Sequence, residues 1–290
     1  MIHRKTFLKL SGLALAGTVL MPSMAFSSNK KRSLGIQLYS LRETIAGNVK
    51  EVMKKLAEVG FKEIETYGYS PEGKFWGFEV EEFKKILNGN GLVTPSGHYG
   101  VNEFLGIKGT DSDFNYLLDV ANTLEQKYVI VPHIAEELRT SIDDYKRMAD
   151  KLNRAGEMCQ NAGLKLGYHN HDFEFFDYNG EHGFDIFLQN TEKDLVDFEL
   201  DLYWVIRAGN DPVALFEKYP GRFKLWHVKD MSRNDFKLNT EIGSGSINFK
   251  EIFNNAEKSG VEHFIIEQEN FEMDPYQSLT KSFDYIQNNF

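Results

Sequence analysis

The feature that most constrains the fold of this chain is a regular alternation of short β-rich runs with amphipathic helical stretches, from residue 33 to the C-terminus. The spacing of these pairs suits the crossover connection between parallel strands. The pairs are 34–40 with 49–59, 61–68 with 80–87, 92–100 with 114–124, 128–134 with 142–162, 164–171 with 184–189, 196–203 with 212–219, 223–230 with 249–259, and 263–269 with 276–287. The pattern predicts an α/β fold, a closed (β/α)8 TIM barrel, as a single domain over residues 33–290.

The N-terminal segment has the pattern of a signal peptide over residues 1–25, followed by a short linker, 26–32. Basic residues at 3–5 precede an apolar run, 7–21, and small residues at 23 and 25 provide a cleavage site. Residues 4–9 also resemble a twin-arginine signal, with Lys5 in the position of the second arginine, so the export route stays open. An N-terminal amphipathic or anchoring helix is the alternative. We expect an exported, periplasmic protein with no stable membrane association after processing.

The charge of the chain limits its partners. The formal net charge is −10, and removal of residues 1–25 would take away Arg4, Lys5 and Lys9 and no acidic residue, leaving −13. Such a chain repels phosphate backbones, which excludes nucleic acid as a partner. Cys159 is the only cysteine, so the chain forms neither an intrachain disulfide nor a thiolate cluster. The expected partner is a small-molecule carbohydrate, and a homodimer packed through the outer helices is compatible with the fold.

Metal-type ligands recur where four consecutive predicted strands end, which in a TIM barrel is the active-site face. These ligands are His169 and His171, then Asp201, then His227 with Lys229 beside it, then Glu267 and Glu269. Side chains alternate along a strand, so the first member of each pair can point into the barrel mouth together with Asp201. The sequence thus predicts a metal site formed by His169, Asp201, His227 and Glu267. Mixed nitrogen and oxygen ligands suit one divalent Mn, Zn, Co or Fe ion.

Four segments resemble the sugar phosphate isomerase/epimerase family of the xylose isomerase-like barrels. They are HNHDFE at 169–174, LDLYW at 200–204, WHVKD at 226–230 and IIEQE at 265–269. The resemblance implies a divalent metal held by a Glu, an Asp, a His and a Glu from four successive strands. Asp201, His227 and Glu267 match the last three ligands. The first position holds His169 where the family has glutamate, and His171 and Glu174 are alternatives for it.

The resemblance also implies the activity. We expect a metal-dependent isomerase or epimerase of a sugar or keto-sugar, which moves a proton through a metal-stabilised enediolate, with Glu267 as base and His171 or Glu174 as its partner. Lys229 is a further catalytic candidate that would stabilise an enolate, or else pair with Asp230 or Glu269. A lyase or hydratase of a 3-keto-glycoside or inosose-type substrate is the alternative, and a non-catalytic sugar-binding barrel is a second alternative.

Other residues near the predicted strand ends are candidates for substrate binding. His98 and His133 can bind hydroxyl groups, although each can also be a core histidine bonded to the backbone. Tyr39 has a similar position, and the aromatic face of Trp204 suits the apolar face of a sugar ring. Glu65 would be costly to bury without a partner.

Overall fold

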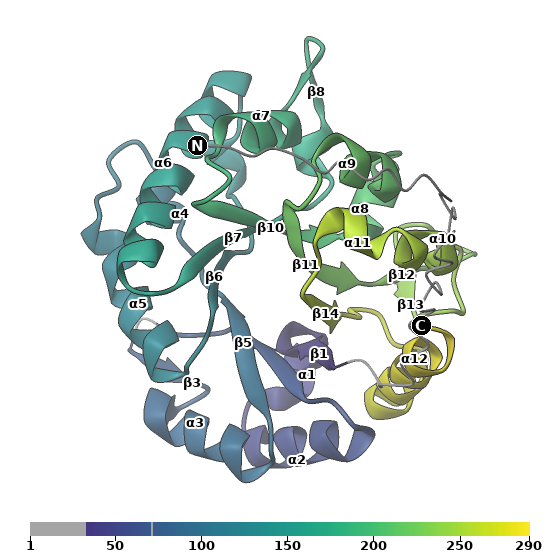
Figure 1. The fold of residues 1–290 in the computed structure, drawn as a ribbon. Helices are drawn as coiled ribbons and strands as arrows, with labels where there is room; N and C mark the ends of the chain where they lie inside the picture. The colour runs from purple at the N-terminus through teal and green to yellow at the C-terminus, as the bar shows by residue number, and fades with distance from the viewer. Residues whose placement is uncertain (1–32, 71) are drawn as a thin grey trace, which may run out of the picture. The chain divides into compact units, whose positions relative to one another are not determined.

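The structure is a computed structural model that describes residues 33–70 and 72–290. The predicted signal peptide, 1–25, and linker, 26–32, lie outside the described residues. Eight parallel strands form a closed barrel with the helices around it, which confirms the predicted TIM barrel (Figure 1). The barrel strands are β1 (Leu34–Gln37), β2 (Glu63–Thr66), β5 (Val93–His98), β6 (Tyr128–Val131), β7 (Lys165–His169), β10 (Val196–Asp201), β11 (Phe223–Val228) and β14 (His263–Ile266).

The larger helices follow the strands in the predicted order. They are α2 (Val49–Val59), α3 (Val80–Gly89), α5 (Ser112–Thr123), α6 (Ile142–Asn161), α7 (Gly183–Asn190), α9 (Pro212–Lys218), α10 (Phe249–Asn254), α11 (Ala256–Ser259) and α12 (Pro275–Asn289). One continuous helix was expected over 249–259, but the backbone turns at Asn255 and divides it into α10 and α11. Within the part of the chain that the structure describes, no helix is both long and apolar enough to cross a membrane.

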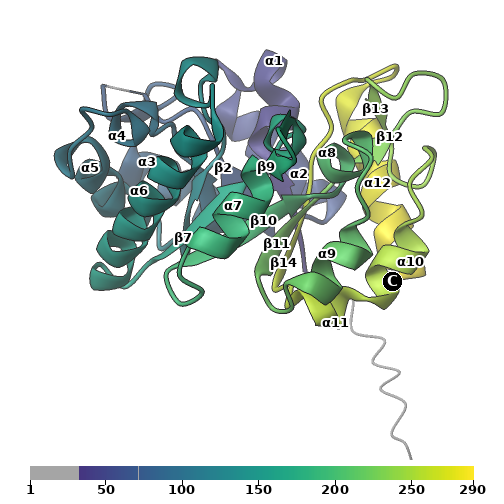
Figure 2. The same ribbon diagram turned by 90° about the horizontal axis from the view of Figure 1, so that it is seen from above.

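The loops after the strands contain short elements that the sequence pattern does not predict. Three of these are two-stranded hairpins: β3 (Lys74–Phe75) with β4 (Phe78–Glu79), β8 (Asp177–Tyr178) with β9 (Glu181–His182), and β12 (Asp230–Met231) with β13 (Asn239–Thr240). The others are short helical turns: α1 (Arg42–Ile45), α4 (Asn102–Leu105), α8 (Leu202–Arg207), η1 (Leu38–Leu41), η2 (Glu136–Leu138) and η3 (Phe173–Phe175). In the side view, α1 and the β12–β13 hairpin lie at the same end of the barrel, where the strands end (Figure 2).

Glycine ends α2 and allows the chain to enter the next strand. Gly60 has φ +118°, and its N–H donates to the carbonyls of Leu56 and Ala57. A Cβ at Gly60 would lie 2.8 Å from the ring of Phe283 on α12. Both the left-handed backbone and the close approach of α12 therefore require glycine here.

The barrel interior is layered. Ile130, Leu225 and Ile265 are fully buried and belong to one small apolar cluster of barrel-strand residues. His227 follows Leu225 by two residues, and Glu267 follows Ile265 by two, so each side chain faces the same side of its strand as its apolar neighbour. A polar layer therefore lies directly above the apolar one, at the strand ends.

Candidate metal centre

Four strand ends bring the predicted ligands together. Asp201, His227 and Glu267 form a group whose ligand atoms all lie within 4.8 Å of one another, and all three side chains are buried. Glu267 Oε2 lies 3.1 Å from His227 Nδ1, and Asp201 Oδ2 lies 4.0 Å from the same nitrogen. His169 Nε2 lies 4.0 Å from Asp201 Oδ2 on the other side. One carboxylate oxygen of Asp201, the last residue of β10, thus lies near ligand atoms of His169, His227 and Glu267, which come from the ends of β7, β11 and β14.

Asp201 Oδ2 is a buried oxygen without a hydrogen-bond donor. It is fully buried and makes no hydrogen bond, although Lys229 Nζ lies 3.2 Å away. The other oxygen, Oδ1, accepts the N–H of Trp204 at 3.0 Å and so fixes the carboxylate at the start of α8. Burial of a carboxylate oxygen that makes no hydrogen bond is costly. The donor set and this oxygen therefore fit a bound divalent cation.

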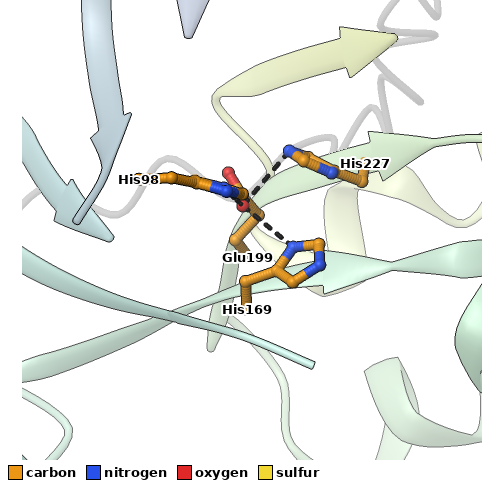
Figure 3. Close-up of side chains that lie close together, drawn as sticks. All are labelled: His98, His169, Glu199 and His227. Carbon is orange, nitrogen blue, oxygen red and sulfur yellow. Dashed lines mark hydrogen bonds and ion pairs between the residues drawn. The ribbon is translucent and has the colours of Figure 1, made fainter. Parts of the chain in front are cut away.

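A second group lies just below, where Glu199 is surrounded by three histidines (Figure 3). Glu199 Oε2 lies 2.7 Å from His98 Nε2, 3.0 Å from His169 Nδ1 and 3.2 Å from His227 Nε2. Glu65 Oε1 lies 2.6 Å from His227 Nε2 and 3.0 Å from His98 Nε2. These atoms already contact one another directly, so an ion would have to separate them. Of the two groups that could hold an ion, the one that contains Asp201, His227 and Glu267 matches the ligands predicted from the sequence.

The charges in this lower cluster balance one another. Burial lowers the pKa of His98, but the carboxylates of Glu65 and Glu199 outweigh burial and raise it to about 9. Burial and the neighbouring Glu65 carboxylate raise the pKa of Glu199 to about 7. The pKa of Glu65 is lowered well below its ordinary value in spite of burial, because His98 and His227 stabilise the carboxylate. A cationic His98 between two acids makes this buried layer tolerable.

Lys229 neutralises part of the metal centre. Its Nζ lies 2.6 Å from Glu267, 2.8 Å from Glu269 and 3.2 Å from Asp201, and its side chain is buried. The pKa of Lys229 is raised well above its ordinary value, because the three carboxylates outweigh the effect of burial. The pKa of Glu267 is lowered in spite of burial, chiefly by Lys229 and then by His227. One ammonium faces three carboxylates, and this excess of negative charge favours a further cation.

A cavity of about 380 Å³ opens above these residues at the barrel mouth. Its lining includes all four residues predicted to bind substrate, Tyr39, His98, His133 and Trp204, and also His169, His171, Lys229 and Glu267. Tyr67 and Glu269 complete two of its walls. His98 is thus also part of the buried ion-pair layer beneath the metal position, a role that the sequence did not indicate.

His171 and Glu174, the two alternatives for the first ligand, have different surroundings. His171 lines the cavity, its Nδ1 is buried without a hydrogen bond, and its ring stacks on Phe173 at 5.3 Å. Burial and the nearby Lys229 cation lower the pKa of His171 to about 3, which keeps the imidazole neutral.

Glu174 is fully buried away from the cavity lining. Its carboxyl group accepts one hydrogen bond from Tyr168 Oη at 2.6 Å and another from the backbone N–H of His171 at 2.9 Å. Glu174 thus links the loop that carries His171 to Tyr168 on β7, whereas His169 is the residue that faces Asp201.

Glu199 is the residue of this centre that the sequence reading did not single out. It lies in the strand VDFELD, two residues after Asp197 and two before Asp201. Three acids at alternate positions of one strand must face the same side. That alternation was the available signal, because it places three acids inside a predicted barrel.

A family model described as xylose isomerase-like TIM barrel matches residues 53–288. Among curated proteins, the inosose dehydratase of Clostridium beijerinckii is 24% identical over 271 residues, which cover 81% of this chain and 88% of that protein.

Solved structures agree on the fold. A sugar phosphate isomerase/epimerase from Parabacteroides distasonis is 29% identical, with a TM-score of 0.78, over 90% of this chain and 95% of that one. The IOLI protein, whose structure has a bound zinc atom, is 12% identical, with a TM-score of 0.72, over 89% of this chain and 99% of that one; at this identity the likeness shows the fold alone.

Proposed function

Since the chain belongs to the xylose isomerase-like TIM barrel family, we propose that it is a divalent-metal-dependent carbon–oxygen lyase acting on a neutral keto-sugar or inosose-type substrate. The similarity to inosose dehydratases over most of the chain favours a dehydratase over the isomerase expected from sequence. The observation that carries the proposal is that one cavity is lined by Glu267, by His171 with its unpartnered Nδ1 and by Lys229. The Lys229 ammonium lies 3.2 Å from the buried carboxylate of Asp201.

We assign the metal to His169, Asp201, His227 and Glu267. Two imidazoles and two carboxylates suit Mn, Zn, Co or Fe, and these residues do not select one of the four. When bound, such an ion polarises a ketone and acidifies the adjacent C–H bond. The low pKa of Glu267, held between His227 and Lys229, suits a ligand better than the base that the sequence suggested.

The chain's own residues supply the proton transfers. The neutral His171 faces the cavity and would take the proton from the carbon next to the ketone as that C–H bond breaks. The C–O bond at the next carbon then breaks as its oxygen takes up the proton that His171 holds, and the group leaves as water or, from a glycoside, as an alcohol. Lys229 stays protonated, and its positive charge would stabilise the oxygen on which negative charge develops.

The cavity favours an uncharged substrate. Among the described residues that line it, Lys229 is the only lysine or arginine, and three carboxylates already contact its ammonium. Phosphate groups are normally bound by free cations. Tyr39, Tyr67 and Trp204 offer aromatic faces of the kind that contact sugar rings. We therefore propose a neutral polyol as the substrate. Export of the protein to the periplasm, expected from its N-terminal segment, is also part of the proposal.

A metal-dependent epimerase is the second candidate, and the 29% identical isomerase/epimerase structure favours it. One experiment separates the two. Metal-loaded protein is incubated in D2O with an inosose and with a 3-keto-glycoside, and the products are analysed by mass spectrometry. A lyase yields a product lighter by one water or one alcohol. An epimerase yields a product of unchanged composition that carries deuterium, and a sugar-binding barrel yields neither.

A further inference from the structure

Glu199 makes an unusual set of contacts for a carboxylate inside a barrel. It is fully buried on β10, and its Oε2 contacts nitrogens of His98 on β5, His169 on β7 and His227 on β11 (Figure 3). Glu65 on β2 contacts two of the same rings, His98 and His227. A carboxylate buried at this cost is retained only where its contacts stabilise it.

The rings of His169 and His227 each turn one nitrogen towards Glu199 and the other towards the metal position. His169 presents Nδ1 to Glu199 at 3.0 Å, and its Nε2 faces Asp201 Oδ2 at 4.0 Å. His227 presents Nε2 to Glu65 and Glu199, and its Nδ1 faces Asp201 and Glu267. An ionised carboxylate only accepts hydrogen bonds, so a ring nitrogen that contacts one carries a proton. For His169 the opposite nitrogen, Nε2, is left to present its lone pair to the metal position. Both nitrogens of His227 contact carboxylates, so a cation at the metal position would displace the proton on Nδ1, while Glu65 and Glu199 hold the proton on Nε2.

We propose that Glu199, with Glu65, is a positioning residue that fixes His169 and His227 in opposite tautomers. His169 is held with its proton on Nδ1 and binds through Nε2, whereas His227 is held with its proton on Nε2 and binds through Nδ1. The two rings reach the carboxylate layer from different strands, β7 and β11. This inference rests on the proposed metal site.

The wild-type protein provides the first test. The metal-free protein is labelled with [15N]histidine, and long-range 1H–15N spectra are recorded before and after zinc is added. Two ring systems should change on zinc binding, one bound through Nε2 and protonated on Nδ1, the other bound through Nδ1 and protonated on Nε2. Two zinc-bound rings of the same tautomer would overturn the inference, and this test requires no variant to fold.

Variants provide the second test, with zinc affinity measured by competition with a chelator. Glu199→Gln should weaken zinc binding about 10–100-fold, because the neutral amide removes the carboxylate charge that holds the ring protons of His169 and His227 on this side. Glu65→Gln should also weaken zinc binding, because Glu65 contacts His227. This variant replaces Glu199→Gln in the test if Glu199→Gln does not fold. Asp197→Asn is the matched control. Asp197 lies on the same strand and face, and its contacts are Tyr128 and Lys165 instead of the histidines.

The outcomes separate this inference from the proposed function. If wild type binds zinc and Asp201→Asn does not, but Glu199→Gln and Glu65→Gln bind as wild type does, the positioning role is overturned and the metal site stands. If Glu199→Gln and Asp197→Asn weaken binding equally, the effect is general destabilisation and the inference is also overturned. If wild type binds no zinc, the proposed function fails first, and the inference fails with it.

Discussion

At the scale of single residues, the centre depends on where buried charges find partners. Lys229 and His98 lie as cations between carboxylates, and Asp201 Oδ2 and Glu199 Oε1 are buried carboxylate oxygens that make no hydrogen bond. The same reasoning predicts which substitutions the fold tolerates. Removing one partner of a buried ion pair costs far more than removing an exposed one.

Lys229→Met tests the balance at the metal centre. Loss of the ammonium leaves Asp201, Glu267 and Glu269 without their shared cation, so the metal-free variant should lose roughly 3–5 kcal/mol of unfolding free energy. Added zinc should restore much of that loss, because the ion supplies the missing positive charge. Urea unfolding at neutral pH with a chelator and with zinc measures both. Lys165→Met, which removes an exposed partner of Asp197, should cost less than about 1 kcal/mol. Equal losses in the two variants would contradict this account.

Glu174→Gln tests the buried carboxyl that holds the His171 loop. Burial raises the pKa of Glu174 from 4.5 to about 7, so the folded state holds this proton more tightly than the unfolded chain does. The stabilisation is fully present below pH 4.5 and is lost as pH rises towards 7, by up to about 3 kcal/mol. The stability of wild type relative to Glu174→Gln should therefore fall across that window and level off above it.

Glu241→Gln is the control for the pH experiment. Burial raises the pKa of Glu241, but the hydrogen bond from Ser278 and other contacts lower it below its ordinary value overall. Its stabilisation is present at neutral pH and is lost as the solution becomes acidic. The stability difference between wild type and this variant should therefore change with pH in the opposite direction. A Glu174→Gln difference that does not vary between pH 4.5 and 7 would refute the assignment.

At the scale of elements, the functional side chains lie where the barrel strands end, and buried hydrogen-bond acceptors fix the loops that follow. Asp230 is the clearest case. Its carboxylate accepts the N–H groups of Met231 at 2.8 Å and Ile247 at 3.2 Å on one oxygen, and those of Gly243 at 2.8 Å and Gly245 at 3.0 Å on the other. The segment 231–247 is therefore closed at both ends on one residue.

Asp230→Asn should loosen this segment. The amide nitrogen cannot accept, so two buried N–H groups lose their partner at about 1–3 kcal/mol each. Hydrogen exchange should accelerate across residues 231–247 more than in the barrel strands. Asp235→Asn is the control in the same segment, because Asp235 is exposed and accepts only the N–H of Lys237. Equal exchange in the two variants would show that Asp230 does not organise the loop.

At the scale of the whole molecule, periodicity predicted the barrel because burial on both faces makes each strand a short apolar run. The short hairpins were not predicted, since two-residue strands are too brief to show a period. The predicted ligands and substrate residues could be placed at strand ends because parallel strands end together. Glu199 could not be matched to His98 from sequence, because the two lie 101 residues apart and meet only when the barrel closes. The position of Glu174 likewise depends on η3, a turn of three residues that is too short to show a periodic sequence pattern.

The central claim is that His169, Asp201, His227 and Glu267 hold one divalent metal. Elemental analysis and zinc titration of purified wild type, Asp201→Asn and Asp197→Asn test it directly. We predict close to one Mn, Zn, Co or Fe per chain in wild type and in Asp197→Asn, and almost none in Asp201→Asn. No metal in wild type after each ion has been supplied, or equal binding by all three proteins, would contradict the account.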